Sequence, residues 1–472
     1  RKGTARKGTA RKGTEREKSA RQLAFEALRA IDRGAFADVV IDRKLNGSKL
    51  SAQDKGLVTE LVYGSVRRQR TLDALIDQFG TRKASQQQAD LLQILRLGFY
   101  QLRYLTHVPD HAVVDTTVQL AKAQRLGKLS GVVNGMLRGY IRQSSALETS
   151  KADPLQLPDD SVTRLGIFHS YPDWIIRVWQ SMLPNAQVAA LCEHFNQPPS
   201  LDLRIDLQRY DLSAAREIFA TENIAVEPVE GVPSALRLLT HKGAITKLPG
   251  YAEGWWTVQD SSAQLVSYLL DPQPGETVMD ACGAPGGKSL HIAALMNNKG
   301  TVWSCDRTPS RTQKIQKNID RISTPNAPSI VRPLTCDSRN QPTFEGKADR
   351  VLLDVPCSGL GTLNRHADAR WRQTPESVAG LVTLQKELLS HVSTWVKPGG
   401  VMVYSTCTLH PDENEAQIQW FLNEHADWRI EPPPADFGSE AGLSATEEGW
   451  IKVWPHQQKM DGFFMVKLIK EG

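Results

Sequence analysis

The sequence predicts a multidomain protein: an all-α N-terminal domain, a small α+β connecting domain and a C-terminal α/β domain with a parallel sheet. Three observations lead to this prediction. Apolar residues recur at helical spacing in the first third of the chain, and short mixed elements follow. Strand-like and helix-like segments then alternate from about residue 254. The length of 472 residues suits about two to four domains.

The first segment, residues 1–18, opens with tandem copies of the pentapeptide RKGTA. It has eight basic and two acidic residues and no large apolar side chain. Because it cannot bury a core, we expect a disordered basic tail. A nucleic-acid-binding arm and a cloning remnant both fit this composition.

Residues 19–145 are predicted to form a helical RNA-binding domain. Apolar runs such as Leu91–Leu102 and Val132–Ile141 have helical spacing. Residues 19–150 hold 19 basic and 12 acidic residues, whereas residues 151–472 hold 30 and 38. Excess positive charge attracts nucleic acid, although a solvated surface explains it about equally well. The candidates for a basic face are Arg67, Arg68, Arg70, Arg82, Lys83, Arg96 and Arg103.

Residues 150–253 are predicted to hold a linker and a small α+β RNA-binding domain. Polar residues and two prolines favour a linker over residues 144–165. A helix is expected to begin at Tyr171–Trp174, and Leu201–Ile205 and Ile224–Val229 alternate like strands.

Residues 254–472 are predicted to form a parallel sheet with helices on both faces. Phe463–Ile469 is expected to add an antiparallel strand at the sheet edge. Ligands of such sheets bind beyond the carboxyl ends of the strands. The predicted parallel strands are Val278–Ala281, Val302–Cys305, Ile330–Leu334, Val351–Asp354 and Val401–Ser405. The helices between them are expected over 287–296, 309–321, 376–395 and 412–423.

The loop after the first of these strands reads DACGAPGGKS, from Asp280 to Ser289. Its end resembles a phosphate-binding loop, but the first glycine of that motif would fall on Cys282, and Pro285 removes a backbone donor. We therefore favour the loop with which a Rossmann-like methyltransferase surrounds the methionine part of S-adenosylmethionine.

Aspartates after the next two strands support this interpretation. Asp306 lies 26 residues after Asp280 and suits the ribose hydroxyls, and Asp337 suits the adenine amino group. A single aspartate at a strand end is usually a cap or turn former. Three of them after consecutive strands favour a nucleotide-like ligand.

Two cysteines carry the remaining chemistry. Cys357 follows Asp354-Val-Pro, and Cys407 ends a Ser-Thr-Cys motif after the next strand. A thiolate that adds to carbon 6 of a pyrimidine makes carbon 5 nucleophilic enough to accept a methyl group. Lone cysteines are usually small buried hydrophobes, as we expect for Cys192 and Cys305. Two cysteines at one predicted sheet edge instead favour catalysis.

Together these motifs resemble the RNA 5-methylcytosine methyltransferases of the Sun/Fmu (RsmB) type, which act on 16S ribosomal RNA of the small subunit. The resemblance covers residues 19–472 and includes an N-terminal domain similar to the antitermination factor NusB. The NusB-like stretches are Leu61–Arg67, Gly98–Leu102, Val108–Ala112 and Val133–Arg138.

The resemblance implies methyl transfer from S-adenosylmethionine to carbon 5 of a cytosine in small-subunit ribosomal RNA. It implies that Cys407 is the nucleophile and that Cys357 assists product release or proton removal. Asp354 would contact the cytosine beside the cofactor, and Lys288 would close the cofactor loop near the base. DNA cytosine-5 enzymes use the cysteine after proline, which leaves Cys357 as the alternative nucleophile. The implied cofactor residues are Cys282, Gly283, Ala284, Pro285, Gly286, Gly287, Lys288, Asp306, Asp337 and Asp354. The family usually has alanine where this chain has Gly283.

Composition also bears on membrane spans, disulfides, metal binding and cellular compartment. No run approaches the roughly 18 apolar residues of a membrane span. Six cysteines without a CxxC pair argue against disulfides or a zinc site and favour a reducing, cytoplasmic compartment. No metal is expected, and a monomer is the default.

Two other functions compete with the methylation of RNA. One is a non-catalytic RNA-binding or antitermination module, and the other is a methyltransferase for a small molecule or protein. The intact cofactor loop and paired cysteines argue against the first, and the cysteines and basic domain argue against the second.

Overall fold

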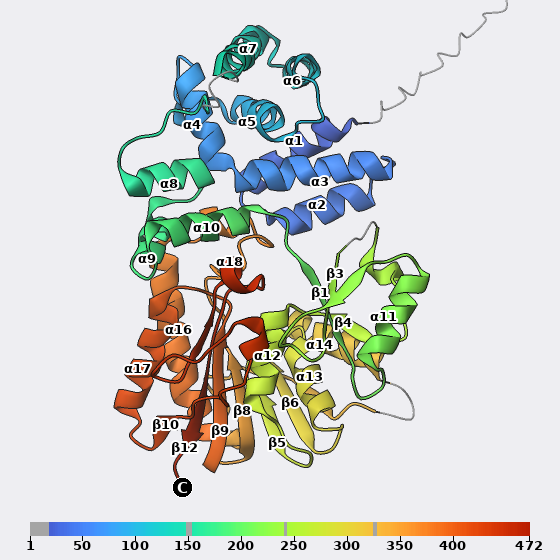
Figure 1. Ribbon diagram of the computed structural model, residues 1–472, viewed down its shortest axis with the longest axis vertical. Helices are drawn as coiled ribbons and strands as arrows, with labels where there is room; N and C mark the ends of the chain where they lie inside the picture. The colour runs from blue at the N-terminus through green and yellow to red at the C-terminus, as the bar shows by residue number, and fades with distance from the viewer. Residues whose placement is uncertain (1–17, 148–152, 240–242, 324–327) are drawn as a thin grey trace, which may run out of the picture. The chain divides into compact units, whose positions relative to one another are not determined.

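The computed structural model describes residues 18–147, 153–239, 243–323 and 328–472 (Figure 1). The chain divides into two compact units, residues 1–157 and 158–472. The RKGTA repeat lies outside the described residues, so its predicted disorder stays a prediction. Within the described ranges, no helix is both long enough and apolar enough to cross a bilayer.

The first unit is a bundle of α-helices around α5 (Ala89–Tyr104), which packs against α1, α3, α4, α6 and α7. A Cβ on Gly98 of α5 would lie 3.0 Å from Leu137, so the glycine allows α7 to approach closely. Ser19 and Gln22 form a capping box that begins the first helix. The predicted all-helical domain is confirmed. The other helices are α1 (Ala20–Asp32), α2 (Ala37–Asn46), α3 (Ala52–Arg67), α4 (Gln69–Phe79), α6 (Asp110–Ala123) and α7 (Ser130–Leu147).

The predicted basic face is wrong for three of its seven cations. Arg96 is 6% exposed, and its guanidinium binds the Asp73 carboxylate at 2.7 and 2.8 Å. Arg103 pairs with Asp153, and Arg67 is buried. These side chains are buried or paired with acids within the first unit, so they stabilise the unit and do not form an exposed basic face.

The second unit begins with α8 (Ser161–His169), α9 (Asp173–Gln180) and α10 (Asn185–Asn196). The predicted linker over residues 144–165 is therefore wrong at both ends, because α7 runs to Leu147 and α8 starts after the cap residue Asp160. Apolar side chains of α9 and α10 form a core with Leu360, Leu363 and Leu409, which belong to the loops after the two catalytic-candidate cysteines.

A small antiparallel sheet follows, with strand order β2-β3-β1-β4. Helix α11 (Leu212–Thr221) packs on it through Phe219, which shares a core with Trp256. Strand β4 lies beyond residue 254, so this sheet includes a strand from the segment that the sequence analysis assigned to the next domain. The strands are β1 (Leu201–Ile205), β2 (Val226–Pro228), β3 (Ala235–Leu238) and β4 (Trp256–Val258).

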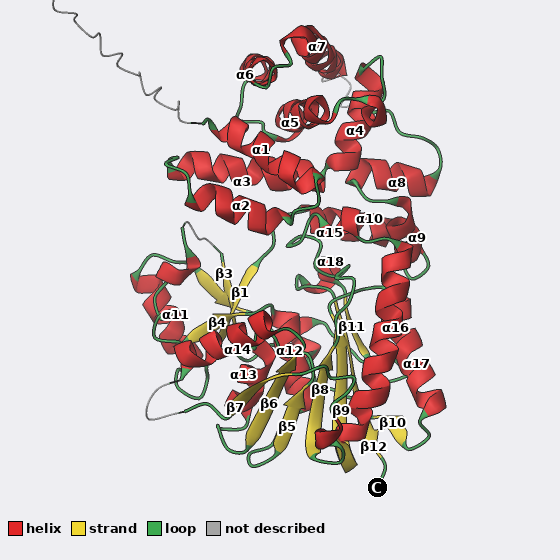
Figure 2. Ribbon diagram, turned by 180° about the vertical axis from the view of Figure 1, so that it is seen from behind, coloured by secondary structure: helices red, strands yellow, loops and turns green. Residues whose placement is uncertain are grey.

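The large sheet has the order β10-β12-β9-β8-β5-β6-β7, with β11 paired to β12. Strands β5 to β9 are mutually parallel, and one apolar core packs α12, α13 and α14 on one face while another packs α16 and α17 on the other (Figure 2). The predicted doubly wound sheet is confirmed. The strands are β5 (Thr277–Asp280), β6 (Thr301–Asp306), β7 (Val331–Thr335), β8 (Ala348–Asp354), β9 (Val396–Thr406), β10 (Trp428–Ile430), β11 (Ile451–Val453) and β12 (Phe463–Lys470). The helices are α12 (Ser261–Leu270), α13 (Gly287–Leu295), α14 (Pro309–Ile322), α16 (Pro375–Val392) and α17 (Glu415–Glu424).

The last strand, β12, is antiparallel to β9 as predicted but does not lie at the edge. Residues 463–466 and Leu468 are buried, as expected for a strand that is covered on both faces. The strands after β5 are added first on one side of it, as β6 and β7, and then on the other, as β8 and β9. The candidate site opens at this switch point between β5 and β8.

Candidate functional site

A cavity of about 340 Å³ lies at the carboxyl ends of the parallel strands in the second unit. It opens at the switch point, where an α/β sheet usually binds its ligand. Most of the residues predicted for the site line it: Cys282, Ala284, Asp306, Asp337, Asp354, Cys357 and Cys407.

The predicted cofactor loop connects β5 to α13 and is shaped by two glycines. Gly286 has φ +102°, a left-handed conformation that favours glycine. A Cβ on Gly283 would lie 2.2 Å from Oγ of Ser304, which is itself 2.7 Å from Oγ of Ser289. In this chain a serine hydroxyl thus fills the space that an alanine at position 283 would need.

Asp280 lies beneath this loop and not in the cavity. Its carboxylate accepts a hydrogen bond of 2.6 Å from the Ser289 hydroxyl. Burial raises the pKa of Asp280 to about 7, because the ionised form loses its hydration. The prediction that Asp280 belongs with the ligand-binding aspartates is therefore corrected: its carboxyl group supports the loop.

The other two aspartates do reach the cavity. Asp306 accepts a hydrogen bond from Thr308 N and lies 3.2 Å from the guanidinium of Arg311. Arg311 also donates to the carbonyl of Ala284, so it connects the ribose-site candidate to the cofactor loop. Its position in the first turn of the helix after Asp306 was the available sequence signal, and the sequence analysis missed it.

Asp337 is held in its charged form by a neighbouring arginine. Nη2 of Arg339 lies 2.7 Å from its carboxylate, and this hydrogen bond lowers the pKa of Asp337 to about 2. An ionised carboxylate at this position is a hydrogen-bond acceptor for an amino group.

The two cysteines meet in the cavity. Strands β8 and β9 are parallel neighbours, and the sulfur atoms of Cys357 and Cys407 in the loops that follow them lie 3.3 Å apart. The hydrogen bond to Cys407 and burial raise the pKa of the Cys357 thiol well above its usual value. Cys357 therefore keeps its proton, and its thiol can donate toward the sulfur of Cys407.

An ion pair lies beside the thiols. Nζ of Lys288 is 2.7 Å from Oδ2 of Asp354, whose Oδ1 accepts a hydrogen bond of 2.8 Å from Ser405. Burial lowers the pKa of Lys288, but the charges of Asp354 and Cys407 outweigh it, and the net shift is upward. The resulting ammonium stabilises negative charge on the neighbouring carboxylate and sulfur.

Glu413 is a supporting residue whose role the sequence analysis missed. It is 0% exposed, and its carboxylate accepts hydrogen bonds from the backbone N of Ser358 at 2.8 Å, the Ser358 hydroxyl, and Gln385 at 3.0 Å. Since Ser358 follows Cys357 directly, Glu413 holds the loop of the first cysteine against the segment after the second. The two glutamates at 413 and 415, shortly after Cys407, were the signal, but the sequence could not show which of them turns inward.

Gly361 is the point where the two cysteine loops touch. Its amide donates a 3.0 Å hydrogen bond to the carbonyl of Cys407, and its carbonyl accepts one of 2.7 Å from Gly462 N. A Cβ on Gly361 would lie 2.1 Å from the Gly462 oxygen and 2.8 Å from the Cys407 oxygen. No side chain fits without moving backbone.

We expect Gly361→Ala to displace Cys407 and to lower methyl-transfer activity by about 100-fold, since a shift of about 1 Å has that effect on a reacting group. Thermal unfolding and activity measurements would check this. Gly380→Ala is the control, because a Cβ there meets nothing within 4 Å. Equal activity of the two variants would contradict the close-contact argument.

Fold and cavity together define the class of the protein, which is a Rossmann-like methyltransferase. Residues 267–469 match the family described as 16S rRNA methyltransferase RsmB/F, and residues 18–142 match the NusB family. Residues 171–244 match the ferredoxin-like domain of RsmF/B-like methyltransferases.

Similar proteins match nearly the whole length of the chain. The probable ribosomal RNA small subunit methyltransferase B of Synechocystis is 48% identical over 96% of this chain and 99% of its own length. The corresponding protein of Bacillus subtilis is 34% identical over 96% and 99%. The crystal structure of PH0851 shares the fold, with a TM-score of 0.77 over 96% of this chain and 98% of its own at 24% identity. The chain belongs to the RsmB family of ribosomal RNA small subunit methyltransferases.

Proposed function

We propose that this protein transfers a methyl group from S-adenosylmethionine to carbon 5 of a cytosine in small-subunit ribosomal RNA. The single observation that carries the proposal is the pair of thiols 3.3 Å apart beside the Lys288–Asp354 ion pair. Methylation of an exocyclic nitrogen needs no thiol, whereas activation of a pyrimidine at carbon 5 needs one. The names of the relatives supply the class of RNA.

The residues around the cavity fit S-adenosylmethionine. The glycine-rich loop offers its backbone to the methionine part, and the Asp306 carboxylate can accept the ribose hydroxyls. Asp337 can accept the adenine amino group, while Leu384 and Leu388 provide apolar contact for the ring. When bound there, S-adenosylmethionine supplies the methyl group.

The chain's own residues would carry out the other steps. The Cys407 thiolate forms a bond to carbon 6 of the cytosine while the carbon 5–carbon 6 double bond opens, and the ammonium of Lys288 stabilises the negative charge that develops on the ring. The Asp354 carboxylate holds Lys288 in place and can accept a hydrogen bond from the amino group of the base. After carbon 5 has gained the methyl group and lost its proton to a base, the carbon–sulfur bond breaks and the electron pair returns to Cys407. We assign Cys357 to this release step because of its contact with Cys407.

The test is methylation of unmodified small-subunit ribosomal RNA with labelled S-adenosylmethionine, followed by digestion and identification of the nucleosides. Labelled 5-methylcytosine is the expected product. Label in another nucleoside, or label only in protein or small molecules, would overturn the proposal.

The reactivity of the thiols gives an independent prediction. We expect iodoacetamide to modify Cys407 at least about fivefold faster than Cys357 near neutral pH, because only the thiolate reacts and Cys357 retains its proton. Mass spectrometry of peptides after short exposure measures both rates. Faster modification of Cys357 would favour it as the nucleophile.

A further inference from the structure

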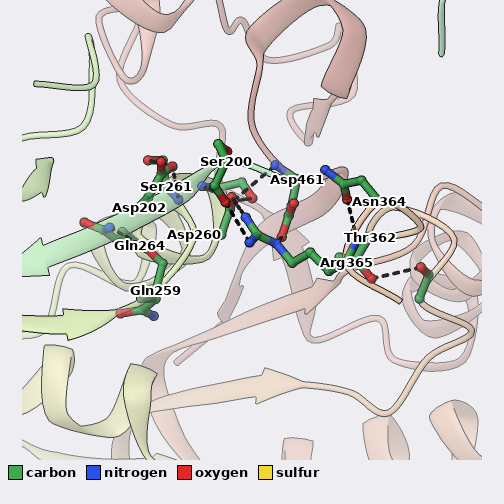
Figure 3. Close-up of polar contacts among 12 residues, drawn as sticks. Ser200, Asp202, Gln259, Asp260, Ser261, Gln264, Thr362, Asn364, Arg365 and Asp461 are labelled. Carbon is green, nitrogen blue, oxygen red and sulfur yellow. Dashed lines mark hydrogen bonds and ion pairs between the residues drawn. The ribbon is translucent and has the colours of Figure 1, made fainter. Parts of the chain in front are cut away.

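Arg365 lies in the loop that follows Cys357 and binds three other parts of the second unit. Its guanidinium lies 2.6 Å from Asp461, 2.8 Å from Asp260 and 2.9 Å from the carbonyl oxygen of Ser200 (Figure 3). The side chains of Asp260 and Asp461 are 7% and 6% exposed. A guanidinium that is shared by two buried carboxylates is strongly constrained in position.

One arm of this contact set reaches the proposed nucleophile. Asp461 directly precedes Gly462, whose amide donates to the carbonyl of Gly361 at 2.7 Å. The amide of Gly361 in turn donates to the carbonyl of Cys407 at 3.0 Å. Since a Cβ on Gly361 would overlap both Gly462 and Cys407, these three backbone segments have no free space between them.

The other arm reaches the small sheet. Ser200 immediately precedes strand β1, and Asp260 caps α12 through Ser262 while also accepting from the amide of Asp461. Asp202, two residues after Ser200, accepts from the amide and hydroxyl of Ser261, which directly follows Asp260. The same Asp202 binds Arg237 of β3 at 2.8 and 2.9 Å. Polar contacts, joined by the adjacent residues 260–261 and 461–462, therefore connect β3 to Cys407.

The charge balance shows why an arginine is needed at the centre. Burial and the neighbouring Asp260 raise the pKa of Asp461, because two buried carboxylates repel each other, and the charge and hydrogen bond of Arg365 oppose this rise. A lysine would keep the charge, but its donors all sit on one nitrogen, whereas Arg365 binds its three acceptors through three different nitrogens of a rigid plane.

From these contacts we infer that Arg365 is a positioning residue: it fixes the backbone of Cys407 through Asp461, Gly462 and Gly361, and connects the nucleophile to the small sheet. The inference deepens the proposed function and rests on the role of Cys407 in it. Arg365 is too far along this chain of contacts to touch the reacting atoms itself; it acts on where the thiolate lies.

The experiment compares Arg365→Lys with Arg350→Lys in the full-length protein. Arg350 is a matched control in the same unit, because it also binds a carboxylate, Glu276 at 2.8 Å, and a carbonyl, Leu270 at 2.7 Å. It lies on β8 and is not part of the contacts that reach Cys407. We measure kcat for RNA methylation, the Kd for S-adenosylmethionine, the iodoacetamide rate of Cys407, and Tm.

We expect Arg365→Lys to lower kcat by about 10-fold or more, with the Kd for S-adenosylmethionine unchanged within about twofold. The iodoacetamide rate of Cys407 should change by at least about threefold, whereas Arg350→Lys should alter Tm alone. The inference is overturned if both variants lose activity only in proportion to Tm and alkylate at the wild-type rate.

Two further measurements distinguish a failure of the positioning role from a failure of the proposed function. If Arg365→Lys does not fold, Asp461→Asn, which keeps the shape and weakens the contact with Arg365, should give the same change in alkylation. A wild-type protein without 5-methylcytosine product would refute the proposed function, but the alkylation of Cys407 in the Arg365 and Arg350 variants would still decide the positioning role.

Discussion

Replacing Cys407 by alanine is expected to lower the formation of 5-methylcytosine by at least about 10³-fold, because the reaction loses its nucleophile. The fold should survive, since Cys407 is only partly buried and alanine keeps its Cβ while removing the sulfur that contacts Cys357. Binding of S-adenosylmethionine, measured by calorimetry, should change little. Loss of activity without loss of binding would assign the effect to chemistry.

Cys357→Ala gives the complementary result. If Cys357 acts in release, this variant should still form the bond to carbon 6 and then accumulate a protein–RNA adduct that survives a denaturing gel. Cys192→Ala is the matched control, since this fully buried cysteine lies in the core of α9 and α10. Full activity of Cys407→Ala, combined with inactivity of Cys357→Ala, would exchange the two roles.

Much of the fold could be predicted because local patterns determine it. The strands of the parallel sheet are short apolar runs separated by helical segments, so their order and direction follow from right-handed connections. The position of β12 could not be predicted this way. Whether β12 lies at the sheet edge depends on whether β10 and β11 pair with it, and these two strands have only three residues each.

The same difference between local and long-range information applies to the candidate site. The convergence of Cys357 and Cys407 could be predicted, because the ends of neighbouring parallel strands meet at one edge. The contacts of Glu413 and Arg365 could not, since each joins segments that are far apart in the chain: 55 residues separate Ser358 from Glu413, and 165 separate Ser200 from Arg365. Arg96 was wrongly placed on an exposed basic face, because its burial depends on a partner, Asp73, that the sequence pattern does not reveal.

Glu413→Gln should produce the second large effect, on stability as well as on catalysis. The change replaces one acceptor oxygen by an NH₂ group that faces the donors of Ser358 and Gln385. Hydrogen bonds to a charged group contribute about 1.5–3 kcal/mol, and a buried donor without a partner costs about 1–3 kcal/mol. We therefore expect a loss of roughly 3 kcal/mol, which corresponds to a fall in Tm of roughly 5–10 °C.

Catalysis should suffer further than stability, because the Ser358 amide adjoins Cys357 and the hydroxyl of Ser358 also lies 2.8 Å from Thr408, next to Cys407. When Glu413 no longer holds these groups, the 3.3 Å contact between the sulfurs loosens, and kcat should fall by about 100-fold at a temperature where the variant is fully folded. Glu424→Gln is the control, since Glu424 is an exposed residue on α17, the helix that begins just after Glu413. A variant at position 413 that unfolds earlier but retains its kcat would show that Glu413 stabilises the fold without positioning the thiols.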